Sequence, residues 1–537
     1  MKGIIILVLV LMICAGLSLA ITIHVPGEYP TIQEGIDAAV DGDTVLVAVG
    51  TYYERIDFLG KEIVVISESG PEETVIDGEQ LGTVVMIQSG EGPGTVLEGF
   101  TITNGYHYDI GSAGIHCGMN AAPVIRGNII EDNGQTWSCM GGGISSFNAS
   151  PIIEGNLITN NVCMYEGGGI CLHGSDRVII RNNTIAMNFV SSGYGVSVGL
   201  GIHLDNSSAL IENNIIVSND GGAPCMGGGI SLANSTSNAD FNDVWDNTTR
   251  NYYGCTAAPF DISADPLFVG GAPYSYELTE DSPCVDAGAF TSEPDPDGTR
   301  ADMGAYYRDR MGMNVAIVPD RWPVVIPAGG GSFSYTLYLT NHTIGPSLFD
   351  VWVDVRMPDG TIVGPLILRE DITFASGQQF TRNMIQSVPA GAIGGTYYYM
   401  VHTGDFPTGT ILHETIMPFE KEGDGDLAGN WTLLPSLDEL CGQSAVRDNL
   451  ESFLSLECSP NPFNPLSTLQ FDLSVSGYVS LKIYDLSGRA VATLLDRQLE
   501  SGSHSVSFDG SSLASGIYLA ALRSGESKAI KRMLLIK

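Results

Sequence analysis

The chain carries a repeated pair of asparagines, five residues apart, with a period of about 28 residues. The pairs are Asn128 and Asn133, Asn156 and Asn161, Asn183 and Asn188, Asn214 and Asn219, and Asn242 and Asn247. Isoleucines keep a constant phase with them, at Ile125, Ile153, Ile180 and Ile211 before the first asparagine and at Ile130, Ile158, Ile185 and Ile216 after it. Such a unit is too short for a pair of helices, and its β-branched runs break at Asn and Gly. Each unit is therefore expected to form one coil of a solenoid.

Stacked coils would place equivalent residues above one another, because neighbouring strands lie about 4.8 Å apart. Matching asparagines would then hydrogen-bond along the stack while the isoleucines fill the interior. A Gly-Ile pair opens a further short strand in each unit, at Ile115, Ile144, Ile170, Ile202 and Ile230. The pattern predicts an all-β fold for this region, a right-handed parallel β-helix.

A column of charges supports the same register. Two residues before the first asparagine of each pair stand Arg126, Glu154, Arg181, Glu212 and Asp240. Opposite charges alternate along most of this column, and stacked neighbours of opposite charge stabilise adjacent strands. A catalytic role for one of the arginines is the alternative, and the ladder favours the structural role.

The ends of the repeat region resemble the pectin-lyase-like family of right-handed β-helix proteins. Residues 30–39 read as a short helix with Thr31 and Glu34 at capping-box spacing, and such a helix would plug the open end of the solenoid. Asp302-Met303-Gly304-Ala305-Tyr306 is similar to the closing segment of that family. The resemblance covers roughly residues 22–308 and implies one β-helix domain over 21–311.

Composition and the N-terminus indicate an exported protein. Residues 1–20 have one lysine, an apolar run and small residues before Ile21, as in a secretory signal peptide. No later stretch reaches the roughly 18 apolar residues needed to span a bilayer, so no membrane span is expected in the mature chain. The net charge of -37 argues against a nucleic-acid partner. Nine cysteines remain beyond the signal peptide, an odd number that leaves at least one thiol unpaired.

Two further domains are expected after the β-helix. Residues 312–420 alternate as in a small immunoglobulin-like β-sandwich, and residues 421–450 read as an acidic linker. Residues 451–537 resemble the type A sorting domain of the type IX secretion system, a second small β-sandwich. The match rests on residues 460–465, 483–489 and 515–518 and on the basic C-terminal end. The resemblance implies that outer-membrane secretion machinery is a partner and that the protein is secreted or lies at the cell surface.

The loops between each second asparagine and the next Gly-Ile pair are expected to emerge along one side of the solenoid. These loops hold the candidate glycan-binding residues Tyr106, Tyr108, Asp109, Trp137, Tyr165, Glu166 and Tyr194. Exposed rings at coil spacing would stack on sugar faces, and carboxylates would accept bonds from sugar hydroxyls. The alternative is that these rings cover the cores of their loops. A disulfide between Cys139 and Cys163 would stiffen the row.

The sequence leaves open whether the protein is an enzyme. Cys171-Leu172-His173-Gly174 is the nearest fragment to a hydrolase motif, and it is a weak one. His116 and His203 fall three coils apart, too far to share a metal. Asp295, Asp297 and Asp302 have oxygen-ligand spacing that would suit calcium, although the same segment also reads as a plain turn.

Three classes of function remain. A secreted surface protein that binds extracellular polysaccharide is favoured. A polysaccharide lyase or glycoside hydrolase of the pectin-lyase-like fold is the second, and a structural or adhesin-like protein without a glycan ligand is the third.

Overall fold

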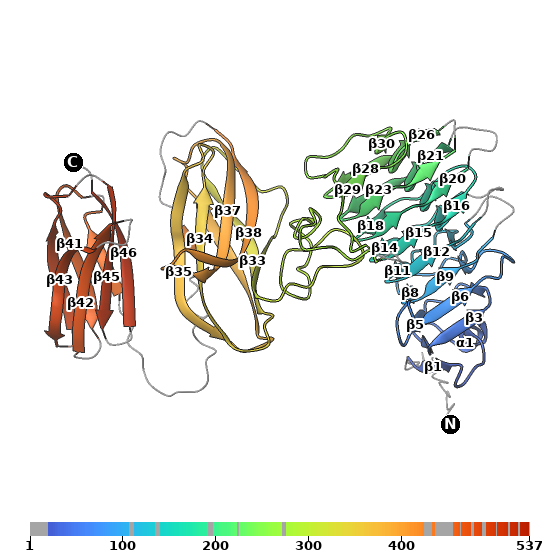
Figure 1. The fold of residues 1–537 in the computed structure, drawn as a ribbon, viewed down its shortest axis with the longest axis horizontal. Helices are drawn as coiled ribbons and strands as arrows, with labels where there is room; N and C mark the ends of the chain where they lie inside the picture. The colour runs from blue at the N-terminus through green and yellow to red at the C-terminus, as the bar shows by residue number, and fades with distance from the viewer. Residues whose placement is uncertain are drawn as a thin grey trace, which may run out of the picture. The chain divides into compact units, whose positions relative to one another are not determined.

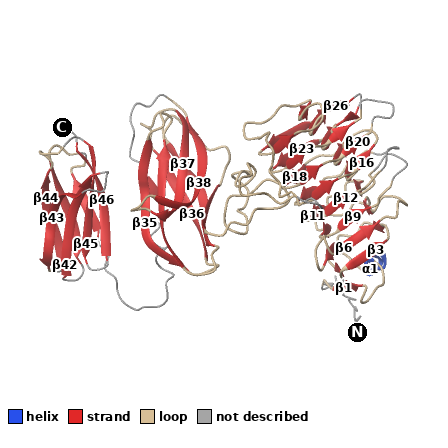
Figure 2. Cartoon of the chain, in the orientation of Figure 1, coloured by secondary structure: helices blue, strands red, loops and turns tan. Residues whose placement is uncertain are grey.

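A computed structural model describes residues 20–537, apart from 107–111, 135–139, 192–196, 223–224, 271–274, 424–431, 435–454, 462, 474–476, 486–489, 501, 514–515, 525–526 and 536. The chain divides into two compact units, Met1–Gln443 and Ser444–Lys537. Strands dominate both units, and the described residues contain one α-helix, α1 (Ile32–Ala38) (Figures 1 and 2).

The first part of unit 1 is a parallel β-solenoid built from three sheets. Sheet A contains, in order, β1 (Thr22–Val25), β2 (Thr44–Val47), β5 (Val64–Ser67), β8 (Val96–Glu98), β11 (Val124–Arg126), β14 (Ile152–Glu154), β18 (Val178–Arg181), β23 (Ser208–Glu212) and β28 (Thr236–Asp240). Sheet B contains β3 (Gly50–Tyr53), β6 (Thr74–Asp77), β9 (Thr101–Thr103), β12 (Ile129–Glu131), β15 (Leu157–Thr159), β19 (Thr184–Ala186), β24 (Ile215–Val217) and β29 (Asp243–Trp245). Sheet C contains β4 (Ile56–Asp57), β7 (Val85–Ile87), β10 (Ile115–Gly118), β13 (Ile144–Phe147), β17 (Ile170–His173), β22 (Ile202–Asp205), β27 (Ile230–Ala233) and β30 (Tyr252–Tyr253).

Short strands also form in the loops that lead from sheet B to sheet C. One small sheet contains β16 (Val162–Cys163), β20 (Phe189–Val190) and β25 (Asp220–Gly221), and another pairs β21 (Ser197–Val198) with β26 (Cys225–Gly227). These loops therefore stack in register over several coils, as expected for loops that emerge on one side of a solenoid.

The asparagine ladder is confirmed. The Nδ2 of Asn183 donates to the Oδ1 of Asn214 at 3.0 Å and to the carbonyl oxygen of Ile153 at 2.8 Å. The backbone N–H and the Nδ2 of Asn156 both donate to the Oδ1 of Asn183 at 3.0 Å. The second asparagine of each pair repeats this arrangement, for example between Asn188 and Asn219. Each buried amide thus satisfies backbone groups at a turn that would otherwise be left without partners.

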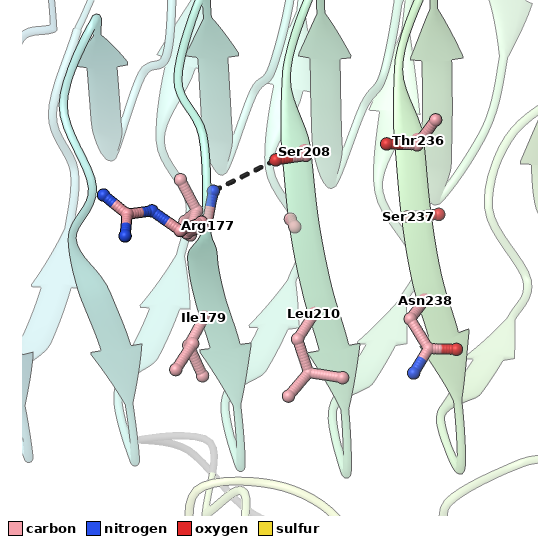
Figure 3. A pocket seen from close by; sticks show the side chains of 9 residues that line it. Arg177, Ile179, Ser208, Leu210, Thr236, Ser237 and Asn238 are labelled. Atoms are coloured by element: carbon pink, nitrogen blue, oxygen red, sulfur yellow. Dashed lines mark hydrogen bonds between the residues drawn. The ribbon is translucent and has the colours of Figure 1, made fainter.

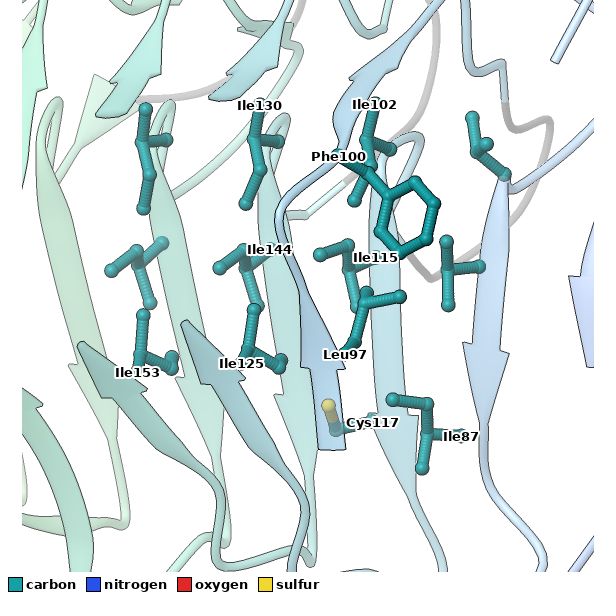
Figure 4. Packing of buried hydrophobic residues seen from close by; sticks show 14 of the residues in the cluster. Ile87, Leu97, Phe100, Ile102, Ile115, Cys117, Ile125, Ile130, Ile144 and Ile153 are labelled. Atoms are coloured by element: carbon teal, nitrogen blue, oxygen red, sulfur yellow. The ribbon is translucent and has the colours of Figure 1, made fainter. Parts of the chain in front are cut away.

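The interior of the solenoid is filled by aligned columns of aliphatic side chains (Figure 4). One column contains Leu97, Ile125 and Ile153, and another contains Ile102 and Ile130, all fully buried. Because each column repeats similar side chains, every added coil buries the same apolar surface against its neighbour. The predicted isoleucine columns are confirmed.

The charge column also lies as predicted, at the C-terminal ends of successive strands of sheet A. Arg126 pairs with Glu98 at 2.7 Å, and Arg181 pairs with Glu154 at 2.7 Å. Glu98 extends the column by one coil before the first complete repeat. Both arginines are thus held by carboxylates in neighbouring coils.

Helix α1 covers the N-terminal end of the solenoid core. The Oγ1 of Thr31 accepts a hydrogen bond from the backbone N–H of Glu34 at 3.1 Å, as the capping spacing predicts. Ile32 and Ile36 are fully buried in the same cluster as the first coils. The helix therefore shields apolar side chains that would otherwise face solvent at the open end.

Two antiparallel sheets follow the solenoid within unit 1. The first contains β31 (Met313–Pro319), β33 (Gly331–Asn341), β36 (Gln379–Val388) and β39 (Thr432–Leu434). The second contains β32 (Val325–Ile326), β38 (Thr410–Lys421), β37 (Gly395–Asp405), β34 (Ser347–Arg356) and β35 (Ile362–Phe374). Strand β39 lies within the segment expected to be a linker. Its pairing with β36 adds one strand to the sheet, so part of this segment is not a linker.

Unit 2 also contains two antiparallel sheets. One contains β40 (Ser455–Ser459), β41 (Leu466–Leu473) and β44 (Gly502–Asp509). The other contains β43 (Ala490–Leu499), β42 (Gly477–Asp485), β45 (Gly516–Ser524) and β46 (Ser527–Leu535). Phe463, from the proline-rich segment at residues 460–465, is buried and bridges to Leu535.

Candidate functional site

Two columns of side chains point outward from sheet C. The strand register aligns His116, Ser145, Cys171, His203 and Ser231 in one column. It aligns Gly118, Phe147, His173, Asp205 and Ala233 in the other. Ionisable side chains of adjacent coils, on β17 and β22, therefore lie next to one another.

Glu166 lies above this face, in the loop that leads into β17. It forms parallel bridges with Met140 and Val198, the residues at the same place in the neighbouring coils. Gly167 has a φ of 66°, and a side chain there would approach the Cβ of Cys171 to 2.6 Å. Only glycine fits this conformation and this contact, so the loop lies close against β17.

One carboxylate oxygen of Glu166 faces both histidines. The Oε2 of Glu166 lies 3.2 Å from the Nε2 of His173 and 3.5 Å from the Nε2 of His203. The other ring nitrogen of each histidine is also occupied. The Nδ1 of His173 lies 3.3 Å from the Oδ2 of Asp205, and the Nδ1 of His203 lies 3.1 Å from the Oγ of Ser231.

Burial and charge set the protonation of this cluster. Burial lowers the pKa of His203, whose side chain is 3% exposed. The imidazole of His173, 3.2 Å from the carboxylate, lowers the pKa of Glu166, which is partly exposed. At neutral pH Glu166 is therefore ionised and His203 is neutral, with its Nε2 directed at the carboxylate.

Aromatic rings extend the cluster along sheet C. The rings of Phe147 and His173 stack with centroids 5.0 Å apart, and His116 lies 5.7 Å from Phe147 on the other side. Tyr165, next to Glu166, is 39% exposed. The face thus combines ring surfaces with carboxylate acceptors over several coils.

Only part of the predicted glycan row falls among the described residues. Tyr165 and Glu166 lie beside sheet C, and Tyr106 is half-buried near the start of its loop. Tyr108, Asp109, Trp137 and Tyr194 lie outside the described residues. Cys139 does too, so its bridge to Cys163 stays a prediction.

The three aspartates predicted to bind calcium lie in the segment after the solenoid, where they accept backbone hydrogen bonds. Asp297 accepts from the N–H groups of Thr299 and Arg310, and Asp295 accepts from the N–H of Asp302. Burial raises the pKa of Asp295 to about 8, and repulsion from the Asp302 carboxylate adds to this increase. Burial also raises the pKa of Asp302 to about 7, and repulsion from Asp286 and Asp297 adds to that increase. These contacts fit an ordered turn, and calcium binding there stays a prediction.

One group of three metal-ligating side chains is present in the part of the chain that the structure describes. It contains Glu166, Cys171 and His173, whose ligating atoms lie within 4.8 Å of one another. The sequence had pointed to Cys171 and His173 only as a fragment of a hydrolase motif and to Glu166 only as a glycan contact.

Sheet A has a groove on its outer face near the last coils (Figure 3). Ile179, Leu210 and Asn238 form one row of its lining, and Arg177, Ser208 and Thr236 form another. The lining has no carboxylate or histidine, so sheet C is the better candidate for chemistry or metal binding.

Comparison with known proteins matches two segments of the chain. The family described as "Right handed beta helix region" matches residues 84–258, and the family described as "Secretion system C-terminal sorting domain" matches residues 458–537. No curated protein matches the chain. Among solved structures, red sea bream transglutaminase aligns with 43% of this chain and 32% of its own chain at 12% identity, and its TM-score of 0.14 carries no weight for the fold.

The sorting domain indicates secretion or a place at the cell surface through its secretion machinery. Among the described residues, no helix has the length and apolar character needed to cross a membrane. The chain therefore combines a right-handed β-helix region with a C-terminal sorting domain of the type IX secretion system.

Proposed function

We propose that this exported β-helix protein binds an extracellular polysaccharide along the outer face of sheet C. The observation that carries the proposal is the strip of rings and carboxylates on that face, with Phe147 stacked on His173, Tyr165 exposed, and Glu166 and Asp205 beside them. Ring faces stack on sugar faces, and carboxylates accept hydrogen bonds from sugar hydroxyls. A binding face that extends over several coils suits a polymer better than a single small molecule.

The negative charge of the protein limits which polysaccharides can be the ligand. A net charge of -37 disfavours a polyanionic glycan unless a divalent cation bridges the two. The ligand is therefore a neutral polysaccharide or an acidic one bridged by calcium.

A glycan array probed with the full chain tests this proposal. We expect saturable retention that falls at least tenfold when Trp137 and Tyr165 are replaced by Ala, with the melting temperature nearly unchanged. Tyr53→Ala, an exposed tyrosine on sheet B, is the matched control and should retain full binding. Absence of retention on every glycan would refute the proposal, and a collapsed melting transition would show that the two rings belong to a loop core.

A lyase or hydrolase is the second candidate, favoured by the contact of His173 with two carboxylates. His173 lies between Glu166 and Asp205, and such a pairing can hold a histidine ready to transfer a proton. Depolymerisation products on incubation with the retained glycan would select this candidate. Saturable binding without products would select the binding protein.

We also propose that residues 312–420 form an immunoglobulin-like spacer. Their two antiparallel sheets and alternating buried residues, including Tyr335 and Tyr399, support this assignment. Such a spacer would separate the β-helix from the sorting domain without taking part in ligand binding.

A further inference from the structure

We propose that the cluster on sheet C is a binding site for a divalent transition metal ion, with zinc the best match. Glu166, Cys171 and His173 supply three ligands, and His203 supplies the fourth. Carboxylate, thiolate and imidazole together are the ligand set that zinc prefers, whereas calcium and magnesium prefer oxygen ligands alone. The site does not depend on glycan binding.

Two of the distances between ligand atoms match those expected around a tetrahedral ion. Zinc bonds to nitrogen and oxygen of about 2.0–2.1 Å place two such ligands about 3.4 Å apart at the edge of a tetrahedron. The Oε2 of Glu166 lies 3.2 Å and 3.5 Å from the Nε2 atoms of His173 and His203. The thiol of Cys171 lies within 4.8 Å of the ligating atoms of Glu166 and His173. His203 lies outside that trio, so its Nε2 would have to move toward the ion to become the fourth ligand.

The contacts behind the two histidines provide a second, independent argument. Metal-binding histidines almost always hold their other ring nitrogen on a carboxylate or another hydrogen-bond acceptor, which fixes the tautomer and aims the ring. Here the Nδ1 of His173 faces Asp205, and the Nδ1 of His203 faces the hydroxyl of Ser231. Both Nε2 atoms therefore lie close to the same carboxylate oxygen, and a metal ion would sit between these three atoms.

Burial also favours an ion here. Cys171 is fully buried and the side chain of His203 is 3% exposed, while the side chains of His173 and Glu166 are 18% and 28% exposed. The ion would therefore lie against two buried ligands and two ligands that solvent partly reaches. Coordination by sulfur requires the thiolate, so binding releases the proton of the Cys171 thiol to solvent.

Metal analysis of the full mature chain after equilibration with zinc tests the site. We expect one zinc ion for each chain, and an affinity at least tenfold lower in His173→Ala. His116→Ala is the control, since His116 lies on the same face of sheet C but outside the cluster, and it should bind zinc like the unaltered protein. Millimolar calcium should not displace the zinc. No saturable zinc binding, or equal binding by His173→Ala, would overturn the proposal.

Two more variants separate metal ligation from loss of structure. Asp205→Asn keeps the shape of the side chain and removes the charge behind His173, so the zinc affinity should fall about tenfold or more. In the cobalt-loaded protein, Cys171→Ser should remove the sulfur-to-metal charge-transfer absorption in the near ultraviolet. If the cobalt spectrum is the same in Cys171→Ser as in the unaltered protein, Cys171 is not a ligand and the assigned ligand set is wrong. Glycan retention is read on the same variants, so failure of one proposal leaves the other standing.

Discussion

At the scale of single residues, the buried asparagines link neighbouring coils of the solenoid through hydrogen bonds. The amide of Asn183 contacts Asn156, Asn214 and the carbonyl of Ile153, so its loss leaves donors and acceptors in two neighbouring coils without partners. The paired arginines of the charge column are different, because Arg126 and Arg181 are nearly half exposed and such pairs contribute at most about 1 kcal/mol.

Asn183→Ala should therefore lower the free energy of unfolding of unit 1 by about 2 kcal/mol or more, because a buried polar group left unsatisfied costs about 1–3 kcal/mol. Asn238→Ala, at an exposed position of sheet A, should change it by less than about 0.5 kcal/mol. Urea unfolding of the full chain, followed by circular dichroism, measures both. Equal effects of the two substitutions would mean that the ladder adds no stability.

The residues of the repeat could be predicted because each is fixed by its phase in a regular pattern. The asparagine, isoleucine and charge columns all lie where the spacing placed them. The cluster on sheet C could not be predicted in the same way, because His173 is the third residue after its Gly-Ile isoleucine and aligns with Gly118, Phe147 and Asp205, which share no chemistry. Aligning this second outward position across coils would have placed His173 beside Asp205.

At the scale of elements, the loops between sheets B and C determine which side chains lie over sheet C. Glu166 reaches both histidines because its loop folds back over β17, and loop lengths differ from coil to coil. No repeat in the sequence gives this path. The segment that holds Asp295, Asp297 and Asp302 is also hard to predict from sequence, because the spacing of these aspartates fits both a turn and a calcium site.

A buried acid in β29 should make the stability of unit 1 depend on pH. Burial raises the pKa of Asp243 to about 6, whereas the unfolded side chain titrates near 3.9. Between these values the folded chain binds more protons, so the free energy of unfolding falls as the pH rises, by about 3 kcal/mol in all. Asp243→Asn should remove this part of the slope, as thermal melts at about pH 4.5 and 7.5 would show.

The exposed Asp246→Asn is the control for that measurement, and its slope should match that of the unaltered protein. A slope in Asp243→Asn that equals the control would mean that Asp243 is ionised in the folded protein at low pH.

Calcium titration tests whether the segment after the solenoid binds calcium. If Asp295, Asp297 and Asp302 hold the ion, calorimetry of the full chain should show saturable binding that Asp295→Asn abolishes, because the ion needs these oxygen ligands together. No heat at millimolar calcium would leave the segment as a turn held by backbone hydrogen bonds.

At the scale of the whole molecule, the sorting domain and the proposed binding face belong to different units. The sorting domain lies in the unit that begins at Ser444, while sheet C lies in the unit before it. Deleting residues 455–537 should leave the protein in the periplasm of its host, with the melting transition of unit 1 preserved. Immunoblots of periplasmic and surface fractions measure the outcome, and normal appearance at the surface would contradict the role of the domain.

The regular stacking of the coils also bears on how such a chain can change in length. Ile125 takes the same place in its coil as Leu97 in the coil before it. Excision of residues 97–124 would therefore join equivalent points and keep every later column in phase, whereas the loss of a single residue within a strand would turn core side chains outward. Whole coils are thus the natural unit of insertion and deletion in this protein, and each event shifts the loops on one side of the cluster by a single step along the axis.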